Sequence, residues 1–231
     1  MSEQPITTRR SRRLFLQAVS AGICGTLAVT LPGCSLGVMF GKMLNGEPMI
    51  PAEFRTMTRE DLAKGKHTVL VVCKAPDSVD SENSTLSYDL IDGITRRLKL
   101  HGVKVINPDR VASWIDEHGG IGSDPSELAK DFETDYIIFI EVQSFGYREP
   151  NSPKLLRGQS AGFVRVFEVN EVGGQQIANT VFATEFNSTY PKHQPVSEQG
   201  RSSLIFQKEY MDRFCDQIAE KFYDHRPGSD L

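Results

Sequence analysis

Tyr136-Ile-Ile-Phe-Ile-Glu-Val142 is the stretch that decides the fold class of this chain of 231 residues. The run is rich in β-branched and aromatic residues, which predicts a β-strand that extends towards Phe145. A second continuous apolar run, Thr68-Val-Leu-Val-Val-Cys73, is typical of a buried strand. The segments around these two strands indicate how they are connected.

Three helices and a short strand are predicted between the two runs. The first helix covers residues 86–100, because apolar side chains recur there every four positions, and Gly102 ends it. A short strand follows at 103–106. Two further helices begin at Asn107-Pro108 and Asp124-Pro125, where a capping side chain precedes a proline. The apolar stripe of the first helix consists of Leu86, Leu90, Ile94 and Leu98.

The second half of the chain predicts two more strands and a last helix. Residues 159–169 and 176–188 have strand character, and Gly173-Gly174 between them is a strong hairpin signal. Apolar residues at helical spacing between Ser202 and Tyr223 predict the helix; they are Ile205, Met211, Phe214, Cys215, Ile218, Ala219 and Phe222. This order of elements indicates an α+β fold. Its mixed sheet of about five strands, parallel first and then an antiparallel meander, packs with three to four helices.

An export signal is predicted at the amino terminus. Arg9, Arg10, Arg12 and Arg13 precede an apolar run at 14–31, the arrangement of a signal peptide. Within it, Ser11-Arg12-Arg13-Leu14-Phe15-Leu16-Gln17 resembles the twin-arginine signature at every defined position except the last. The resemblance implies a route of export. A chance arginine pair in an ordinary secretory signal is the alternative.

Leu31-Pro32-Gly33-Cys34 resembles a lipobox, which implies that Cys34 carries diacylglycerol in the mature protein. Two or more acyl chains anchor a protein stably to a bilayer. We therefore expect a lipoprotein that faces the periplasm from the outer or the inner membrane. The alternative is a free cysteine just beyond a membrane-anchoring helix.

The predicted organisation has four parts. They are an export signal at 1–33, the lipidated cysteine with a flexible tether at 34–66, one globular domain at 67–225 and a tail at 226–231. The signal contains four of the 26 basic and one of the 30 acidic residues, so the mature net charge is about −7. This acidic balance argues against nucleic-acid binding as the main function.

Two cysteines, Cys73 and Cys215, belong to the predicted domain. An oxidising compartment permits a disulfide between them. Cys73 lies in an apolar strand and Cys215 on an apolar helix face, where a free cysteine behaves as a small hydrophobic residue. Burial as free thiols is the favoured prediction.

The element order resembles the small α/β domain shared by the amino-terminal domain of TolB, the penicillin-binding-protein activator LpoB and the curli-secretion lipoprotein CsgG. The residues that carry the resemblance are the first strand at 69–72, the helix at 86–100 and Asp-Tyr-Ile-Ile-Phe-Ile at 135–140. The resemblance implies a non-catalytic protein that binds partner proteins or assembles in the envelope. The resemblance assigns no binding residue to a position in this chain.

Gly158-Gln159-Ser160-Ala161-Gly162 matches the Gly-x-Ser-x-Gly motif of a serine hydrolase, and His118-Gly119-Gly120 is similar to an esterase oxyanion loop. The motif requires a turn from a strand into a helix, whereas a strand is predicted after Ser160. The His-Gly-Gly segment follows a helical pattern, although the esterase motif follows a strand. A hydrolase using Ser160, with His193 or His225 as base, is therefore the less favoured alternative.

No cofactor and no metal site is predicted. The histidines are isolated, and Asp131, Glu133 and Asp135 are expected to be a solvated edge that could hold a cation only weakly. An exported cofactor carrier is a further alternative, because the twin-arginine route moves folded cargo.

Two expected loops, 147–158 and 189–201, are the candidate surface for a protein partner or for a homo-oligomer. They contain Tyr147, Arg148, Tyr190, Lys192 and His193. Plain connecting loops are the alternative. The overall prediction is a non-enzymatic, membrane-anchored envelope lipoprotein that binds a partner or assembles.

Overall fold

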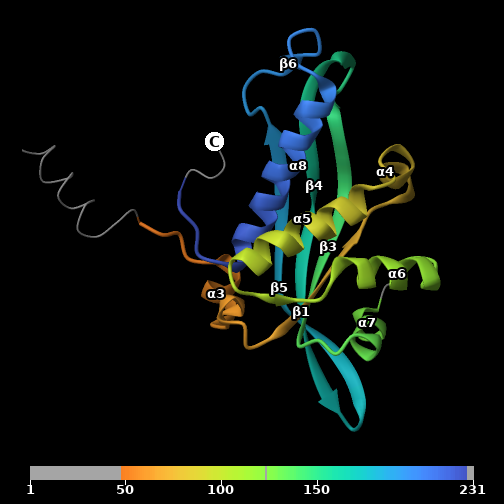
Figure 1. Ribbon diagram of the computed structural model, residues 1–231, viewed down its shortest axis with the longest axis vertical. Coiled ribbons are helices and arrows are strands. Elements are labelled where there is room, and N and C mark those ends of the chain that lie inside the picture. The colour runs from red at the N-terminus through yellow and green to blue at the C-terminus, as the bar shows by residue number, and fades with distance from the viewer. Residues whose placement is uncertain (1–47, 123, 228–231) are drawn as a thin grey trace, which may run out of the picture. The chain divides into compact units, whose positions relative to one another are not determined.

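The computed structural model describes residues 48–122 and 124–227. Its strands are β1 (Thr68–Lys74), β2 (Lys104–Val105), β3 (Tyr136–Glu149), β4 (Ser152–Val172), β5 (Gln175–Tyr190) and β6 (Val196–Ser197). They form one sheet in the order β2-β1-β3-β4-β5, with β6 paired to β4 (Figure 1). β2, β1 and β3 are parallel, and β3, β4 and β5 are antiparallel. The predicted α+β fold with a mixed sheet is confirmed.

The helices in the described residues include the four that the sequence predicts and two short additional ones. They are α3 (Glu53–Thr58), α4 (Asp77–Glu82), α5 (Leu86–Leu100), α6 (Pro108–His118), α7 (Pro125–Asp131) and α8 (Ser203–Ala219), with 3-10 turns η1 (Leu62–Lys64) and η2 (Glu220–Phe222). The predicted caps form: the Asn107 side chain accepts a hydrogen bond from the amide of Asp109, and Asp124 accepts one from Ser126. None of these helices is both long and apolar enough to cross a bilayer.

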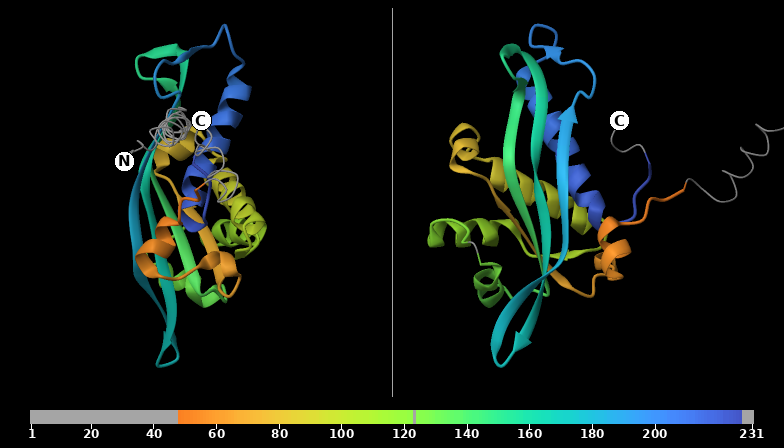
Figure 2. Two further views of the ribbon diagram at one scale, coloured as in Figure 1. Left: turned by 90° about the vertical axis from the view of Figure 1, so that its left-hand side faces the viewer. Right: turned by 180° about the vertical axis from the view of Figure 1, so that it is seen from behind.

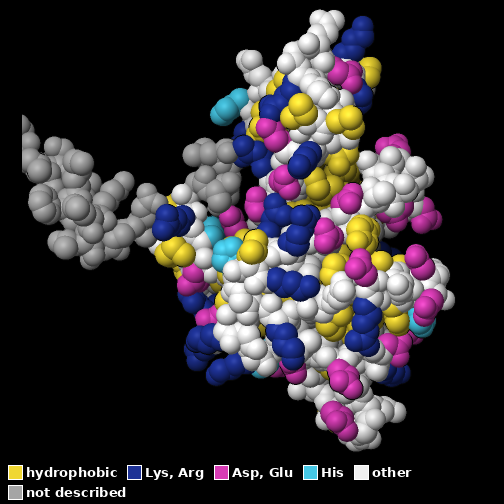
Figure 3. Space-filling model, viewed as in Figure 1, with side chains coloured by type: hydrophobic (Ala, Val, Ile, Leu, Met, Phe, Trp, Pro, Cys, Tyr) yellow, Lys and Arg dark blue, Asp and Glu magenta, His cyan; other side chains and the backbone are white. Residues whose placement is uncertain are grey.

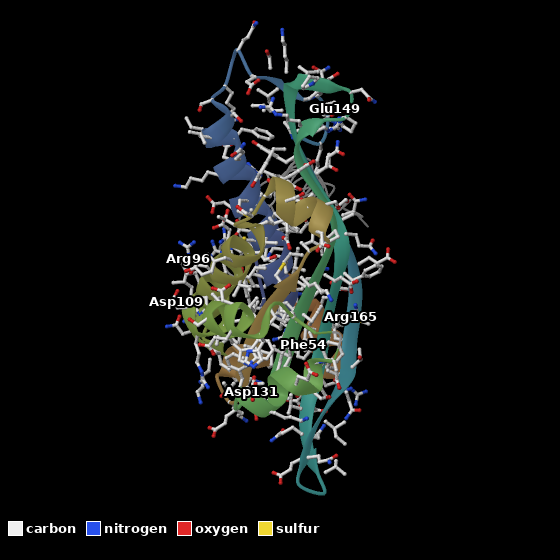
Figure 4. The ribbon with its side chains drawn as sticks, turned by 90° about the vertical axis from the view of Figure 1, so that its right-hand side faces the viewer. Phe54, Arg96, Asp109, Asp131, Glu149 and Arg165 are labelled. Atoms are coloured by element: carbon white, nitrogen blue, oxygen red, sulfur yellow. The ribbon has the colours of Figure 1, made fainter. Side chains whose placement is uncertain are left out.

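The two faces of the sheet are covered differently. α5 and α8 pack on the face that carries Val164 and Phe186, and Figure 2 shows both helices on one side of the long strands. α7 packs on the other face, where Pro125 and Phe139 line a small cavity of about 180 Å³. Figure 4 labels Arg96 of α5 and Arg165 of β4 on opposite sides of the sheet, and Arg165 lines the cavity beside α7. Much of the apolar core therefore lies between the sheet and the pair α5 and α8.

The antiparallel strands are longer than the sequence indicates. Gly173 and Gly174 both have positive φ, 62° and 81°, and form the predicted hairpin turn between β4 and β5. However, β3 continues to Glu149 and β4 begins at Ser152, so the predicted loop at 147–158 is wrong for most of its length. Its strand pattern is hidden because Gly158 occupies a buried position where an apolar side chain is the usual signal.

The predicted tether also requires a correction. The compact unit begins at Met49, and both Phe54 of α3 and Leu62 of η1 are fully buried. Phe54 packs edge-on against Tyr136, with ring centroids 5.9 Å apart, and lies low in the interior in Figure 4. Residues 49–66 are therefore part of the fold. The prediction failed because isolated apolar anchors produce no periodic pattern.

The last helix forms as predicted, but one residue of its expected apolar stripe is wrong. Ile205 is exposed, whereas Phe206 and Tyr210 are buried in its place. Cys215 on the same helix is buried, and both it and Cys73 are free thiols, as predicted.

Candidate functional site

The signal and lipidation residues lie outside the described part of the chain. This applies to the signal motif and the lipobox, namely Ser11, Arg12, Arg13, Phe15, Leu16, Leu31, Pro32, Gly33 and Cys34. The predicted site residues that the structure does describe belong to the domain.

The Gly-x-Ser-x-Gly motif is a packing motif in β4. Gly158, Ser160 and Gly162 occupy alternate positions of the strand and therefore lie on one face. A Cβ atom at Gly158 would overlap the ring of Tyr210, and one at Gly162 would overlap the backbone oxygen of Glu141. Between them, Ser160 is 2% exposed, and its Oγ accepts a hydrogen bond of 2.8 Å from the Tyr210 hydroxyl. Gly158 and Ser160 thus let α8 approach the strand closely, and Gly162 makes room for the neighbouring strands.

The geometry around Ser160 differs from that of a nucleophile elbow. The residue lies within a long strand rather than on a strand-to-helix turn, and among the described residues no histidine hydrogen-bonds to it. His118, from the supposed oxyanion segment, stacks on Trp114 at the end of α6, with centroids 4.1 Å apart. The ring of His225 lies against the carbonyl of Tyr223.

The acidic residues near α7 do not converge. Asp131 accepts a hydrogen bond of 2.7 Å from the indole of Trp114, whereas Asp135 accepts one of 2.6 Å from the amide of Thr68. Within the described ranges, no three side chains of metal-ligating type lie together. Asp131 and Asp135 instead hold local structural contacts, and Glu133 is exposed.

The two segments predicted as a partner surface do meet in space. β6 pairs with the start of β4, so residues 146–158 and 189–202 form one end of the domain, here called the distal end (top of Figure 1). Arg148 binds Glu198 across it at 3.0 Å, and Arg157 donates to the carbonyl of Lys192 at 3.1 Å. Its hydrogen bond to Arg148 lowers the pKa of Glu198. The hairpin and the β6 segment are therefore joined by backbone and side-chain contacts.

The distal end is also tied to the first half of α8. Arg201 forms an ion pair with Glu209, and the guanidinium of Arg213 lies 4.3 Å from the ring centroid of Tyr190. The ring of Tyr190 stacks on Phe206 at 5.9 Å. These contacts hold the loop after β5 against the helix, which makes this part of the surface well ordered.

Two grooves flank α8. The groove on the α5 side has a volume of about 510 Å³, and the groove on the β5 side has a volume of about 300 Å³. The larger is lined by residues of α4, α5 and α8 together with Tyr147, and by Leu204 at the head of α8. The smaller is lined by Tyr190, Pro191, Lys192 and His193 opposite Arg213 and Gln217. Of the five residues named for the predicted partner surface, Tyr190, Lys192 and His193 line the smaller groove and Tyr147 lines the larger.

The larger groove combines apolar and charged groups. Tyr147 is half-buried, burial raises the pKa of its phenol, and its hydroxyl has no hydrogen-bond partner among the described residues. Asp92 on the rim is paired with Arg96 at 2.9 Å, whereas Lys208 forms no ion pair with a described residue. Most residues that line this groove are polar or charged, and its apolar side chains are limited to Leu86, Tyr147, Leu204, Met211 and Cys215.

The predicted partner surface does not include the head of α8, which consists of Leu204 and Ile205. Leu204 is 77% exposed and Ile205 is 59% exposed. Adjacent apolar residues at a helix start could have indicated exposure, because only one of them can face the core at helical spacing.

No model of a known protein family matches this chain, and no curated protein matches it. Solved structures similar to it include a lipoprotein from Neisseria meningitidis, with 15% identity and a TM-score of 0.36 over 66% of this chain and 97% of that one. A PelC dodecamer from Paraburkholderia phytofirmans has 10% identity and a TM-score of 0.41 over 76% and 97% of the two chains. A minor lipoprotein from Acinetobacter baumannii has 15% identity and a TM-score of 0.30 over 67% and 90%. Neither function nor assembly follows from TM-scores this low.

Proposed function

We propose that this chain is a lipid-anchored protein of the bacterial cell envelope that is not an enzyme and binds a partner protein through its distal end and the head of α8. Arg12-Arg13 and the lipobox ending at Cys34 support export and anchoring. The lipid keeps the domain at a membrane facing the periplasm. The domain supplies the binding surface.

The observation that carries the binding proposal is the exposed pair Leu204 and Ile205. Both side chains stand at the start of α8, where Leu204 also lines the groove of about 510 Å³. Neighbouring exposed apolar side chains beside a groove are typical of a protein interaction site. The contacts within the distal end already order its loops, so less conformational entropy is lost when a partner binds.

The non-enzymatic part of the proposal is supported by the role of Ser160. The sequence offers one motif for covalent catalysis, and its serine is buried under the ring of Tyr210. Labelling with a fluorophosphonate probe tests this directly. Labelling that disappears in Ser160→Ala would contradict the proposal.

Mass spectrometry of the mature amino terminus tests the anchor. We expect cleavage before Cys34 and a diacylglyceryl group on its sulfur, with neither in Cys34→Ser. A mature protein with unmodified Cys34 would overturn the anchor. Export that continues unchanged in Arg12→Lys/Arg13→Lys would overturn the twin-arginine route alone.

Photo-crosslinking in cells tests the binding surface. A photoreactive residue at Leu204 should give discrete crosslinked products, whereas one at Val172, which is 59% exposed at the opposite hairpin, should give none. A product of twice the chain mass indicates self-assembly, and any other discrete mass indicates a different protein. Equal labelling from both positions would contradict the proposed surface.

A further inference from the structure

Three parts of the chain that are distant in the sequence form one side of the domain: α3 with η1, the end of α5, and η2. α3 packs on η2 through Phe54 and Phe222, with ring centroids 5.9 Å apart, and Arg55 of α3 reaches Asp61 before η1 at 3.6 Å. The end of η1 touches the end of α5, since a Cβ at Gly65 would lie 3.1 Å from the oxygen of Gly102. We call the exposed residues of 49–66 and 99–104 the basal surface; its chain segments are orange and yellow-green in Figure 1.

The basal surface carries uncompensated positive charge. Arg59, Lys66, Lys99 and Lys104 are all exposed, and none of them forms an ion pair with a described residue. Figure 3 shows Lys and Arg side chains gathered over the lower left of the described surface.

Most acids around the basal surface have partners of their own. Glu53 binds Lys221 at 2.7 Å, and Asp61 lies 3.5 Å from Lys64. Asp224 binds Arg55 at 2.8 Å. Glu60 has no Lys or Arg partner among the described residues, so four unpaired cations face one unpaired acid. This local excess of cations contrasts with the mature net charge of about −7.

Exposed apolar side chains lie among these cations. Met57 of α3 is 62% exposed, and Leu100 at the end of α5 is 84% exposed. Met49 and Ile50 are also exposed, and Ile50 is held by backbone hydrogen bonds of 2.7 and 3.1 Å to His225. Basic residues interspersed with exposed apolar ones are typical of surfaces that lie in the interfacial region of a membrane.

The predicted lipidation residue, Cys34, precedes the basal surface closely in the chain. The folded unit begins at Met49, within the basal surface, and residues 35–48 separate it from Cys34. A chain of that length spans at most about 50 Å when fully extended. Acyl chains on Cys34 would therefore keep Met49, and the basal surface with it, within about 50 Å of the bilayer.

We propose that the basal surface lies against the membrane and binds the headgroups of anionic phospholipids. Cations near such a surface are attracted to it, and the apolar side chains enter the headgroup region. The contact complements the lipid anchor of the proposed function but does not require it. It also gives the domain a fixed orientation at the membrane.

Vesicle sedimentation tests this with residues 34–231 carrying Cys34→Ser, which has no acyl chain. The protein should bind vesicles of equal parts phosphatidylcholine and phosphatidylglycerol at least roughly tenfold more strongly than phosphatidylcholine alone. The difference should shrink as salt is added, because exposed charges are screened. Reversing four charges in Arg59→Glu/Lys66→Glu/Lys99→Glu/Lys104→Glu should abolish the preference.

A matched control reverses four exposed lysines elsewhere, in Lys130→Glu/Lys154→Glu/Lys192→Glu/Lys208→Glu. It has the same net charge as the test variant and should keep the preference. Circular dichroism checks that both variants are folded. Equal binding to the two vesicle types, or equal loss in both variants, would overturn the inference. Binding of the unlipidated protein to dextran sulfate but not to either vesicle would also overturn it. These vesicle results do not depend on whether Cys34 is lipidated in cells. Mass spectrometry of the mature amino terminus tests the anchor separately.

Discussion

Tyr210 is the residue on which the packing of α8 against the sheet depends. Its ring lies over Gly158, its hydroxyl donates to Ser160, and burial raises its pKa to about 12. The ring is stacked nearly parallel to Phe214, at an interplanar angle of 6°. A single side chain therefore joins the last helix to the strand that carries the supposed catalytic motif.

Gly158→Ala should destabilise the domain by about 1–3 kcal/mol, because the new methyl group overlaps the ring of Tyr210. Gly146→Ala is the matched control, since nothing lies within 4 Å of a Cβ at that strand position. Urea unfolding of the two variants measures the difference. Equal stability of the two variants would show that the ring can move aside without cost.

At the scale of elements, Arg97 links α5 to α8 by polar contacts. Arg97 of α5 donates to the carbonyl of Asp212 at 2.8 Å and forms an ion pair with Asp216, both in α8. Close approach of the helices needs Gly93, because a Cβ there would lie 2.6 Å from the Sγ of Cys215. The larger groove beside α8 lies between these two helices, so this contact maintains its width.

Arg97→Ala should lower the free energy of unfolding by about 1–2 kcal/mol, because it removes charged hydrogen bonds from a side chain that is only 16% exposed. Arg96→Ala, next to it in the chain, removes only an exposed pair with Asp92 and should cost about 0.5 kcal/mol or less. Thermal unfolding of both variants compares them. A larger loss for Arg96→Ala would be inconsistent with the role given to Arg97.

The whole molecule should lose stability at alkaline pH. Burial raises the pKa of Cys73 and Cys215 from 9.0 to about 12, and it raises that of Tyr223 from 10.0 to about 12. The folded protein keeps these protons at a pH where the unfolded chain releases them, which favours the unfolded state. The stabilisation is therefore complete below about pH 9 and is lost as the pH rises towards about 12.

Urea unfolding at about pH 8 and about pH 10.5 should show this loss, with a limit of about 1.4 kcal/mol per pH unit for each group. Cys73→Ala should show a smaller dependence on pH than the parent protein, whatever its stability at pH 8. An unchanged dependence would mean that the Cys73 thiol ionises in the folded state near its ordinary pKa.

Periodicity and turn chemistry were enough to predict the class of the fold. The runs at 68–73 and 136–142, the stripe of α5 and the Gly173-Gly174 turn each report a local preference that the fold respects. These signals are local because side-chain spacing and positive φ are properties of a few neighbouring residues. The address residues Arg12, Arg13 and Cys34 are likewise short linear motifs, and they remain predictions.

Only the tertiary structure decided the role of residues without a local pattern. Phe54 and Leu62 join the core through contacts with distant strands and helices, and Gly158 and Ser160 acquire their role from Tyr210, 50 or more residues away in the chain. The distal end and the basal surface arise in the same way, from segments that meet only after folding. Burial and local charge depend on which residues are neighbours in space. The sequence determines these neighbours through the fold, but no local pattern in the sequence reveals them.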